Sequence, residues 1–277
     1  QALATVRSLR QRLDQRGATS RSLLATLDGS FCNKTFFKAE LDRTHLVARC
    51  RKDARLCFPA PVVDSRNGTG SRRLYDPQIF TPEQVRQQGT FPWEQALVYF
   101  GGQWRTLRYK HVQGVLWKRG AGTRRLRLFV IAPVPYKLSK HARINYRDPA
   151  YLLSTDPDAS SAQLIQAYFD RWQIEVNHRD EKDLLGVGQA QVRSPQSVPR
   201  HPAFAVACYS LSLLAALRTF GPGRTSDYLE LPKWRSHSKR PSFLDILTIQ
   251  RKEYNETSVW PFLNTNFIQN LTLYANT

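Results

Sequence analysis

Residues 150–185 read AYLLSTDPDASSAQLIQAYFDRWQIEVNHRDEKDLL and place a short apolar run before one long amphipathic stretch. The run Ala150–Thr155 is typical of a buried strand, and Asp156-Pro157-Asp158 is typical of a helix start. We expect a single helix from about Ser160 to Leu185, ended by the glycines that follow it.

Two faces run side by side along this predicted helix. The first is apolar, spaced by four, three and four residues, and should pack on a sheet: Ile165, Phe169, Trp172 and Val176. The second face is polar and consists of Tyr168, Arg171, Glu175 and Lys182, which span an arc of about 60° at 3.6 residues per turn. Arg179 lies at the edge of this face. On geometry alone, a solvated salt-bridge stripe is the simpler interpretation, because Arg171 and Glu175 form an i,i+4 pair.

The amino-terminal segment predicts the start of an α/β sheet. Residues 4–14 have the periodicity of a short helix, and the run Leu23–Leu27 before the turn Asp28-Gly29 is typical of a buried parallel strand. A helix capped by Asn33 should extend to Leu41, and His45–Cys50 should form the next strand.

The middle of the chain differs in composition. Residues 51–90 are rich in Arg, Pro, Gly and Asn, and several short β-type runs follow: 95–99, 105–109, 112–117 and 126–131. Turn residues separate these runs, so we expect a basic antiparallel β insertion. Two further helices are predicted at about 202–219 and 242–251.

Composition indicates a polyanionic partner. The 277 residues carry a net charge of +19, and 41% are hydrophobic, so a packed core is feasible. Nucleic acid is the commonest partner of such a basic chain, although a merely basic protein has the same composition. The cations gather in four clusters, each of which is alternatively an ordinary solvated surface: Arg49–Arg55, Arg72-Arg73, Lys118–Arg127 and Lys233–Arg240.

Membrane and redox signals are weak. No uninterrupted apolar run reaches the roughly 18 residues of a membrane span, and no secretory signal is visible, so we expect a cytoplasmic protein without a membrane partner. The cysteines form no C-x-x-C pair and are interpreted as buried thiols: Cys32, Cys50, Cys57 and Cys208.

The spacing Tyr168-x2-Arg171-x3-Glu175-x6-Lys182 resembles the YREK signature of DDE transposases from bacterial insertion sequences, in the insertion-sequence-four superfamily. The run Arg171-Trp172-Gln173-Ile174-Glu175 also resembles the RWxIE run of that family. The likeness covers most of the chain, is strongest over 149–220, and is weak over 52–140. It implies an RNase H-like core and Mg²⁺-dependent cleavage and strand transfer at insertion-sequence ends in bacterial cytoplasm.

The same resemblance implies partners and residue roles. The partners are double-stranded DNA, as transposon ends and target, and a second copy of the chain in a synaptic complex. Two Mg²⁺ ions, with Mn²⁺ as a substitute, are held by two Asp and one Glu in this family. The motif makes Glu175 the third carboxylate, and it assigns DNA binding to the remaining members of the polar face: Tyr168, Arg171, Arg179 and Lys182.

Asp28 matches the second carboxylate, because it ends an apolar strand and precedes Gly29. An ordinary Asp-Gly turn is the alternative. Asp14 is rejected as the first carboxylate since it lies in a helix-like polar stretch. The family pattern places that residue before position 1, and the absence of methionine agrees with a fragment. We therefore expect the isolated chain to be inactive.

The expected organisation is an α/β protein with an RNase H-like core that lacks its first strand, a β-rich insertion and carboxyl-terminal helices. The first part of the core is expected at 1–51 and the insertion at 52–148. The core strand with the helices that follow it is expected at 149–222, and a tail at 223–277. In some relatives an insertion Trp stacks on a flipped base, and Trp93, Trp104 and Trp117 are the candidates, with ordinary packing as the alternative.

Two rival functions have the same sequence signals. One is a non-catalytic DNA-binding protein derived from a transposase. The other is an RNase H-like structure-specific nuclease.

Overall fold

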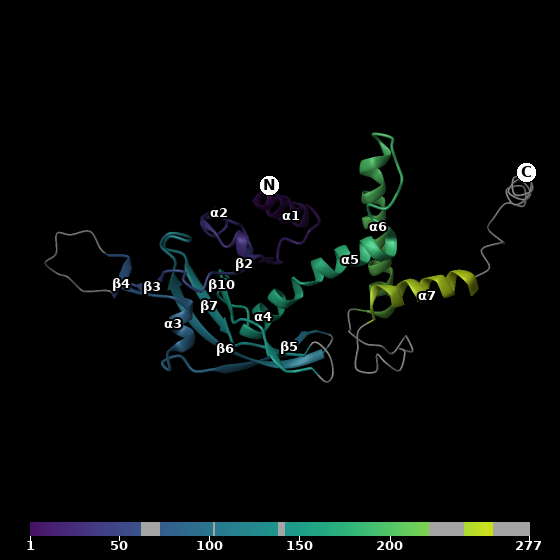
Figure 1. Cartoon of the computed structure of the whole chain (residues 1–277). Coiled ribbons are helices and arrows are strands. Elements are labelled where there is room, and N and C mark those ends of the chain that lie inside the picture. Colours follow the sequence, from purple (N-terminus) through teal and green to yellow (C-terminus); the bar gives the residue numbers. More distant parts are fainter. Residues whose placement is uncertain (62–72, 102, 138–141, 222–240, 257–277) are drawn as a thin grey trace, which may run out of the picture. The chain divides into compact units, whose positions relative to one another are not determined.

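The computed structural model describes residues 1–61, 73–101, 103–137, 142–221 and 241–256 (Figure 1). The fold is mixed α/β, with a mixed central sheet and carboxyl-terminal helices, which confirms the expected class. The chain forms two compact units, Gln1–Trp172 and Gln173–Thr277.

An eight-stranded sheet organises the first unit, in the order β1-β2-β10-β7-β6-β3-β4, with β5 paired to β6. Its strands are β1 (Leu23–Leu27), β2 (Thr44–Arg49), β3 (Leu56–Pro59), β4 (Tyr75–Phe80), β5 (Glu94–Phe100), β6 (Gln103–Leu116), β7 (Arg125–Ile131) and β10 (Ala150–Ser154). β1 and β2 are parallel, as predicted, and the other pairs are antiparallel. The β-rich stretch predicted for 52–148 therefore extends the sheet of β1, β2 and β10.

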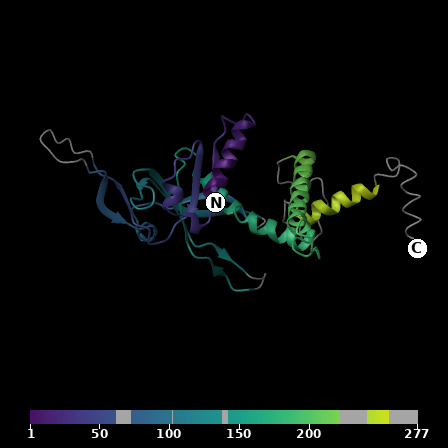
Figure 2. The same ribbon diagram turned by 90° about the horizontal axis from the view of Figure 1, so that it is seen from above.

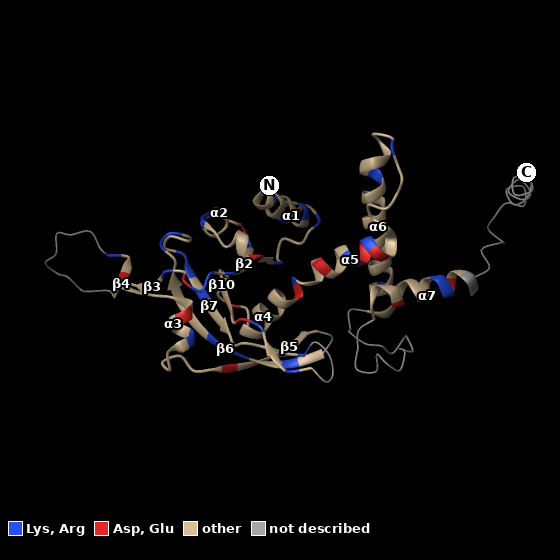
Figure 3. Cartoon of the chain, viewed as in Figure 1, with Lys and Arg blue, Asp and Glu red and all other residues tan. Residues whose placement is uncertain are grey.

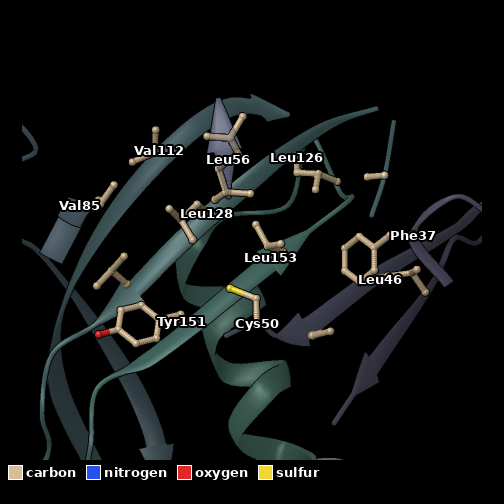
Figure 4. Close-up of a cluster of buried hydrophobic side chains, with 14 of the residues drawn as sticks. Phe37, Leu46, Cys50, Leu56, Val85, Val112, Leu126, Leu128, Tyr151 and Leu153 are labelled. Carbon is tan, nitrogen blue, oxygen red and sulfur yellow. The ribbon is translucent and has the colours of Figure 1, made fainter. Parts of the chain in front are cut away.

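Helices cover both faces of this sheet, because alternate residues of each central strand point to opposite sides. Leu46, Leu128 and Leu153 belong to one buried cluster, shown in Figure 4, which also receives side chains from α2 (Lys34–Phe37) and α3 (Pro82–Gln87). Their strand neighbours Val47, Phe129 and Leu152 belong to a second cluster, completed by α4 (Ser161–Asp170). Each fully buried aliphatic side chain contributes about 1.5–3 kcal/mol, so the two clusters hold the sheet unit together.

Helix α1 (Ala2–Gln15) packs against the first cluster and lies beside the β1–β2 end of the sheet in both views (Figures 1 and 2). It confirms the helix predicted over 4–14. The helix predicted from Asn33 to Leu41 is shorter than expected. Asn33 Oδ1 does accept from the backbone of Thr35 and Phe36, but an i→i−3 bond from Ala39 to Phe36 tightens the last turn and ends α2.

The runs predicted at 105–109 and 112–117 form one strand, β6. A register shift between Val112 and Val115 bends it, and Gly114 takes φ +70° there. Between β3 and β5 the structure adds β4 and α3, which the Arg- and Pro-rich composition of this stretch did not predict.

A buried lysine fixes α3 to the sheet. Lys110 is 2% exposed, and its Nζ donates to the carbonyls of Val85 and Gln88 at 3.0 and 2.5 Å. The same ammonium lies 4.9 Å from the centre of the Trp93 ring. These contacts satisfy the carboxyl-terminal carbonyls of α3, the helix that carries Glu83 and Arg86.

The single helix predicted from Ser160 to Leu185 is wrong. The structure has α4, then a turn at Arg171-Trp172, then α5 (Gln173–Leu185). An i→i−3 bond from Trp172 N to Phe169 O tightens the end of α4 and interrupts the helical ladder. The predicted apolar stripe is broken accordingly, because Ile165 is buried whereas Trp172 is 56% exposed.

The start of α4 agrees with the predicted helix start at about Ser160. Its N-cap is Ser160, which forms a reciprocal capping box with Gln163. Asp156 instead accepts from the backbone of Asp158 and Ala159 and shapes the turn before the helix.

Three helices make up the described part of the second unit: α5, α6 (Ser197–Phe220) and α7 (Phe243–Glu256). Tyr209 of α6 donates to Asn177 of α5 at 2.8 Å and packs on Phe243 of α7 with ring centres 4.1 Å apart. Gly186 and Gly221 take positive φ directly after α5 and α6, as expected for helix ends.

Among the described residues, one helix, Ser197–Phe220, is long and apolar enough to cross a membrane by length and composition. A single helix of this kind is weak evidence, since the core helix of a soluble protein meets the same criteria. The expected absence of a membrane partner stays a prediction.

Candidate functional site

Asp28 and Arg171, which are far apart in sequence, lie close together in the first unit. Asp28 directly follows β1 with extended backbone, and its carboxylate is 59% exposed. The Arg171 guanidinium approaches it, with Nη2 4.0 Å from Oδ1. The end of the parallel β1–β2 pair and the end of α4 therefore meet at one place.

Tyr168 belongs to the same place. The guanidinium of Arg171 lies over the Tyr168 ring, 5.9 Å from its centre. Three residues that the sequence singled out separately, Asp28, Tyr168 and Arg171, are thus brought together by the fold of the first unit. A carboxylate next to a stacked guanidinium and a phenol can combine metal ligation with phosphate binding.

Contacts with the β5–β6 hairpin fix the position of α4. The Gln166 side chain both accepts from Tyr99 N at 2.7 Å and donates to Tyr99 O at 3.0 Å, like a strand pair. Phe169 stacks on Phe100 with ring centres 4.8 Å apart. Tyr168 and Arg171 therefore lie on a helix that is packed on the sheet by neighbouring side chains of the same helix.

At the other end of α4, Arg127 fixes the turn before the helix. Its guanidinium donates to His111 Nε2 at 3.0 Å and to Ala159 O at 2.5 Å. Burial, followed by the charge of Arg127, lowers the pKa of His111. A neutral imidazole is the form that accepts from Arg127, so the pKa shift and the hydrogen bond agree.

The remaining members of the predicted polar face lie on α5 in the second unit. Glu175, Arg179 and Lys182 are exposed there, and their spacing of four and three residues places them on one helix face. Arg179 already pairs with the neighbouring Asp180, with Nη2 2.9 Å from Oδ1.

A hollow of about 410 Å³ opens beside Tyr168, and we call it the tyrosine hollow. Its lining includes Tyr136 and Tyr146, which belong to the two-stranded ribbon of β8 (Pro135–Tyr136) and β9 (Asn145–Tyr146). Tyr146 is 66% exposed, and Arg147 lies over the Tyr136 ring at 5.6 Å. Exposed aromatic rings beside guanidinium groups are typical of surfaces that stack nucleobases and hold phosphates.

Tyr136, Tyr146 and Arg147 were not predicted as site residues from the sequence. The signal was present, because residues 135–148 interleave tyrosines with lysine and arginine. This interleaved pattern has no helical or strand periodicity, so it did not stand out in the sequence. These residues come together only because β8 pairs with β9.

A second hollow, of about 730 Å³, lies next to the first, and we call it the central hollow. Gly29, the residue after Asp28, is part of its wall, and Arg49 and Asp148 line both hollows. Four cations line the central hollow: Arg49, Arg51, Lys52 and Arg86. Basic segments recur on the strands and turns of this unit (Figure 3).

Glu83 is an anion in the wall of the central hollow, and it is compensated. Arg86 donates to it at 2.6 Å, and Tyr151 Oη donates to its other oxygen. These bonds, that from Arg86 first, lower the pKa of Glu83 to about 2. Arg86 is thus committed to Glu83 and Arg51 is paired with Asp53, so Arg49 and Lys52 supply the remaining positive charge of the hollow.

Among the three candidate tryptophans, only Trp104 has a largely exposed side chain, at 57%. Trp117 packs on Phe37, and Trp93 lies under Arg108 and Lys110, so both serve the core. The basic clusters at Arg72 and Lys233–Arg240 lie outside the described residues.

The donor chemistry of Asp28 fits a hard cation such as Mg²⁺, since its exposed carboxylate stands at a strand end. The described residues contain no group of three or more His, Cys, Asp or Glu side chains placed to hold a metal ion. Asp28 and Glu175 belong to different units, and each is one carboxylate. All four cysteines are free thiols; Cys50 and Cys57 are buried, whereas Cys32 and Cys208 are half-buried.

No protein-family model matches this sequence, and no curated protein resembles it significantly.

Proposed function

We propose that the protein is a DDE transposase with an RNase H-like core, which cuts DNA at insertion-sequence ends and joins it to a target. The observation that carries the proposal is the approach of Arg171 to Asp28 beside Tyr168. This approach supports the proposal, because a shared site requires the end of β1 and the end of α4 to meet. The mixed sheet, with its parallel β1–β2 pair and helices on both faces, is compatible with such a core.

Asp28 and Glu175 are the residues that would hold Mg²⁺, or Mn²⁺ in its place. This pairing rests on the resemblance alone, because the two carboxylates belong to different units. When bound, the metal ions activate an attacking oxygen and stabilise the leaving oxygen of a phosphodiester. The reaction needs a third carboxylate from elsewhere in the protein.

The role of the neighbouring residues follows from their chemistry. A planar guanidinium held over Tyr168 presents its donors to a phosphate and neutralises charge next to Asp28. The Tyr168 hydroxyl can donate to an adjacent phosphate oxygen. The cations of the central and tyrosine hollows would then hold the DNA backbone on both sides of the reacting phosphate.

Metal binding and catalysis test the proposal separately. Mn²⁺ binding to residues 1–277 is measured by electron paramagnetic resonance, for the wild type and for Asp28→Asn and Glu175→Gln. We expect each substitution to weaken Mn²⁺ binding by about tenfold or more, because each removes one anionic ligand. Asp42→Asn is the matched control, since Asp42 is an exposed carboxylate whose partner is Arg43.

Cleavage and joining are then assayed with the protein of the complete gene on DNA that carries its own ends. Both substitutions should abolish cleavage and joining while DNA affinity is retained. DNA binding without Mn²⁺ binding or cleavage would instead establish a non-catalytic DNA-binding protein. Cleavage of any DNA without joining would establish a nuclease.

A further inference from the structure

A third hollow, of about 680 Å³, opens in the sheet unit away from Tyr168, and we call it the distal hollow. Its wall is formed by β3, by β4 and by the turn that follows β6. Four cations line it: Arg51, Arg55, Lys118 and Arg119. Its lining also includes apolar side chains such as Leu56 and Ile79 and two carboxylates, Asp53 and Asp76.

Three of the four cations of the distal hollow form no ion pair among the described residues. Arg51 pairs with Asp53 at 2.8 Å, and Asp76 accepts from the backbone of Gln78. No ion pair joins Arg55, Lys118 or Arg119 to a carboxylate within the part of the chain that the structure describes. Lys118 lies 5.3 Å from the centre of the Tyr75 ring, which places its ammonium over the hollow's aromatic wall.

The distal hollow is a neighbour of the central hollow. It shares Cys50 and Arg51 with the central hollow, which in turn shares Arg49 and Asp148 with the tyrosine hollow. The tyrosine and distal hollows have no lining residue in common. Gly29, the residue after Asp28, lines the central hollow, which shares lining residues with each of the other two hollows.

This arrangement matters for the proposed function, on which the present inference rests. A joining reaction brings two DNA molecules to one catalytic site. A single basic surface can hold only one of the two, so a second one is needed. Tyr168 and Arg171 are assigned to the transposon end, next to the tyrosine hollow.

We propose that the distal hollow binds the sugar-phosphate backbone of the target duplex. Arg55, Lys118 and Arg119 would contact phosphates, because none of them forms an ion pair among the described residues and the four cations of the hollow outnumber its two carboxylates, Asp53 and Asp76. Contacts of this kind do not distinguish sequences and depend strongly on salt.

The experiment compares two charge-matched double variants of residues 1–277. Arg55→Gln with Lys118→Gln removes two cations of the distal hollow. Arg7→Gln with Arg12→Gln removes two exposed cations of α1, which line none of the three hollows. Binding of a random-sequence duplex and of a duplex carrying the element's end is measured by fluorescence anisotropy over a range of salt concentrations.

The distal variant should bind the random-sequence duplex about tenfold more weakly, with a salt slope smaller by about 2, which corresponds to two lost phosphate contacts. Its affinity for the end duplex should change by less than about twofold, and the α1 variant should resemble the wild type. Melting curves of the free variants verify that both are folded.

An equal loss on both duplexes would overturn the inference, since the distal hollow would then hold the transposon end or its flank. Unchanged binding of the random-sequence duplex would also overturn it while leaving the proposed function intact. If the wild type binds no DNA, the proposed function fails first and this inference falls with it.

Discussion

At the scale of single residues, Arg171 connects the features of the candidate site. Its guanidinium contacts the Tyr168 ring on its own helix and approaches Asp28 at the end of β1. A lysine would carry the same charge but would lack the planar group that stacks on the ring and presents a fork of donors. If residue 171 binds a phosphate, an arginine is therefore required there and a lysine does not replace it fully.

Replacing Arg171 tests that role. Arg171→Ala should weaken DNA binding and reduce the salt slope by about 0.9, the amount for one phosphate contact. Arg171→Lys should restore the slope but only part of the affinity, because charge returns without stacking. Fluorescence anisotropy titrations over a range of salt concentrations measure both quantities. Arg12→Ala is the control, and a slope that stays unchanged in Arg171→Ala would show that Arg171 contacts no phosphate.

At the scale of elements, α4 positions the site because both of its ends are fixed. The capping box of Ser160 and Gln163 and the bonds from Arg127 hold its start, and Gln166 and Phe169 hold its body on the β5–β6 hairpin. The helix ends after Asp170, where the backbone ladder tightens. Tyr168 and Arg171 consequently lie at the carboxyl-terminal end of a well-anchored short helix.

The capping box makes a measurable contribution. Ser160 Oγ accepts from Gln163 N at 3.2 Å, and Gln163 Oε1 accepts from Ser160 N at 2.9 Å. Ser160→Ala removes one of these bonds and should lower the free energy of unfolding by about 1 kcal/mol. Urea denaturation followed by circular dichroism measures the change. Ser22→Ala, at an exposed serine outside any helix, should leave the midpoint unchanged, and an equal effect of the two substitutions would contradict the capping role.

At the scale of the whole molecule, the two hydrophobic clusters are the main source of stability, and both lie in the first unit. Every member of the two clusters, from Ala2 to Phe169, precedes the boundary at Trp172. The sheet, its covering helices and the three hollows therefore form one structural unit. A unit that contains its own core is expected to fold independently.

A fragment of residues 1–172 should accordingly unfold in one cooperative transition. Leu153 is fully buried in the centre of the sheet, so Leu153→Ala should cost about 2–5 kcal/mol. The loss should be the same in the fragment and in residues 1–277 if the second unit does not stabilise the first. Near-ultraviolet circular dichroism during chemical denaturation measures both values. A fragment without a cooperative transition would show that its core depends on residues beyond 172.

Much of the fold was predictable because local signals and packing agree there. The apolar run of β1 before Asp28, the strands of the middle stretch and the Asn33 cap were all visible in the sequence. The uninterrupted helix through Trp172 was not observed, because periodicity extends an amphipathic pattern across a turn that has no glycine or proline to mark it. The elements β4 and α3 were missed because their residues have loop-like composition and are held by tertiary contacts such as those of Lys110.

The sequence by itself determined the residue types at the candidate site, the positive charge and the α/β class, since motif spacing, composition and periodicity are local properties. Only the tertiary structure decided that Arg171 approaches Asp28, that Tyr136, Tyr146 and Arg147 line the hollow beside Tyr168, and that cations from β2, α3 and the turns line neighbouring hollows. The physical reason is that strand pairing joins residues without regard to their separation in sequence, and no local pattern encodes which strands become neighbours.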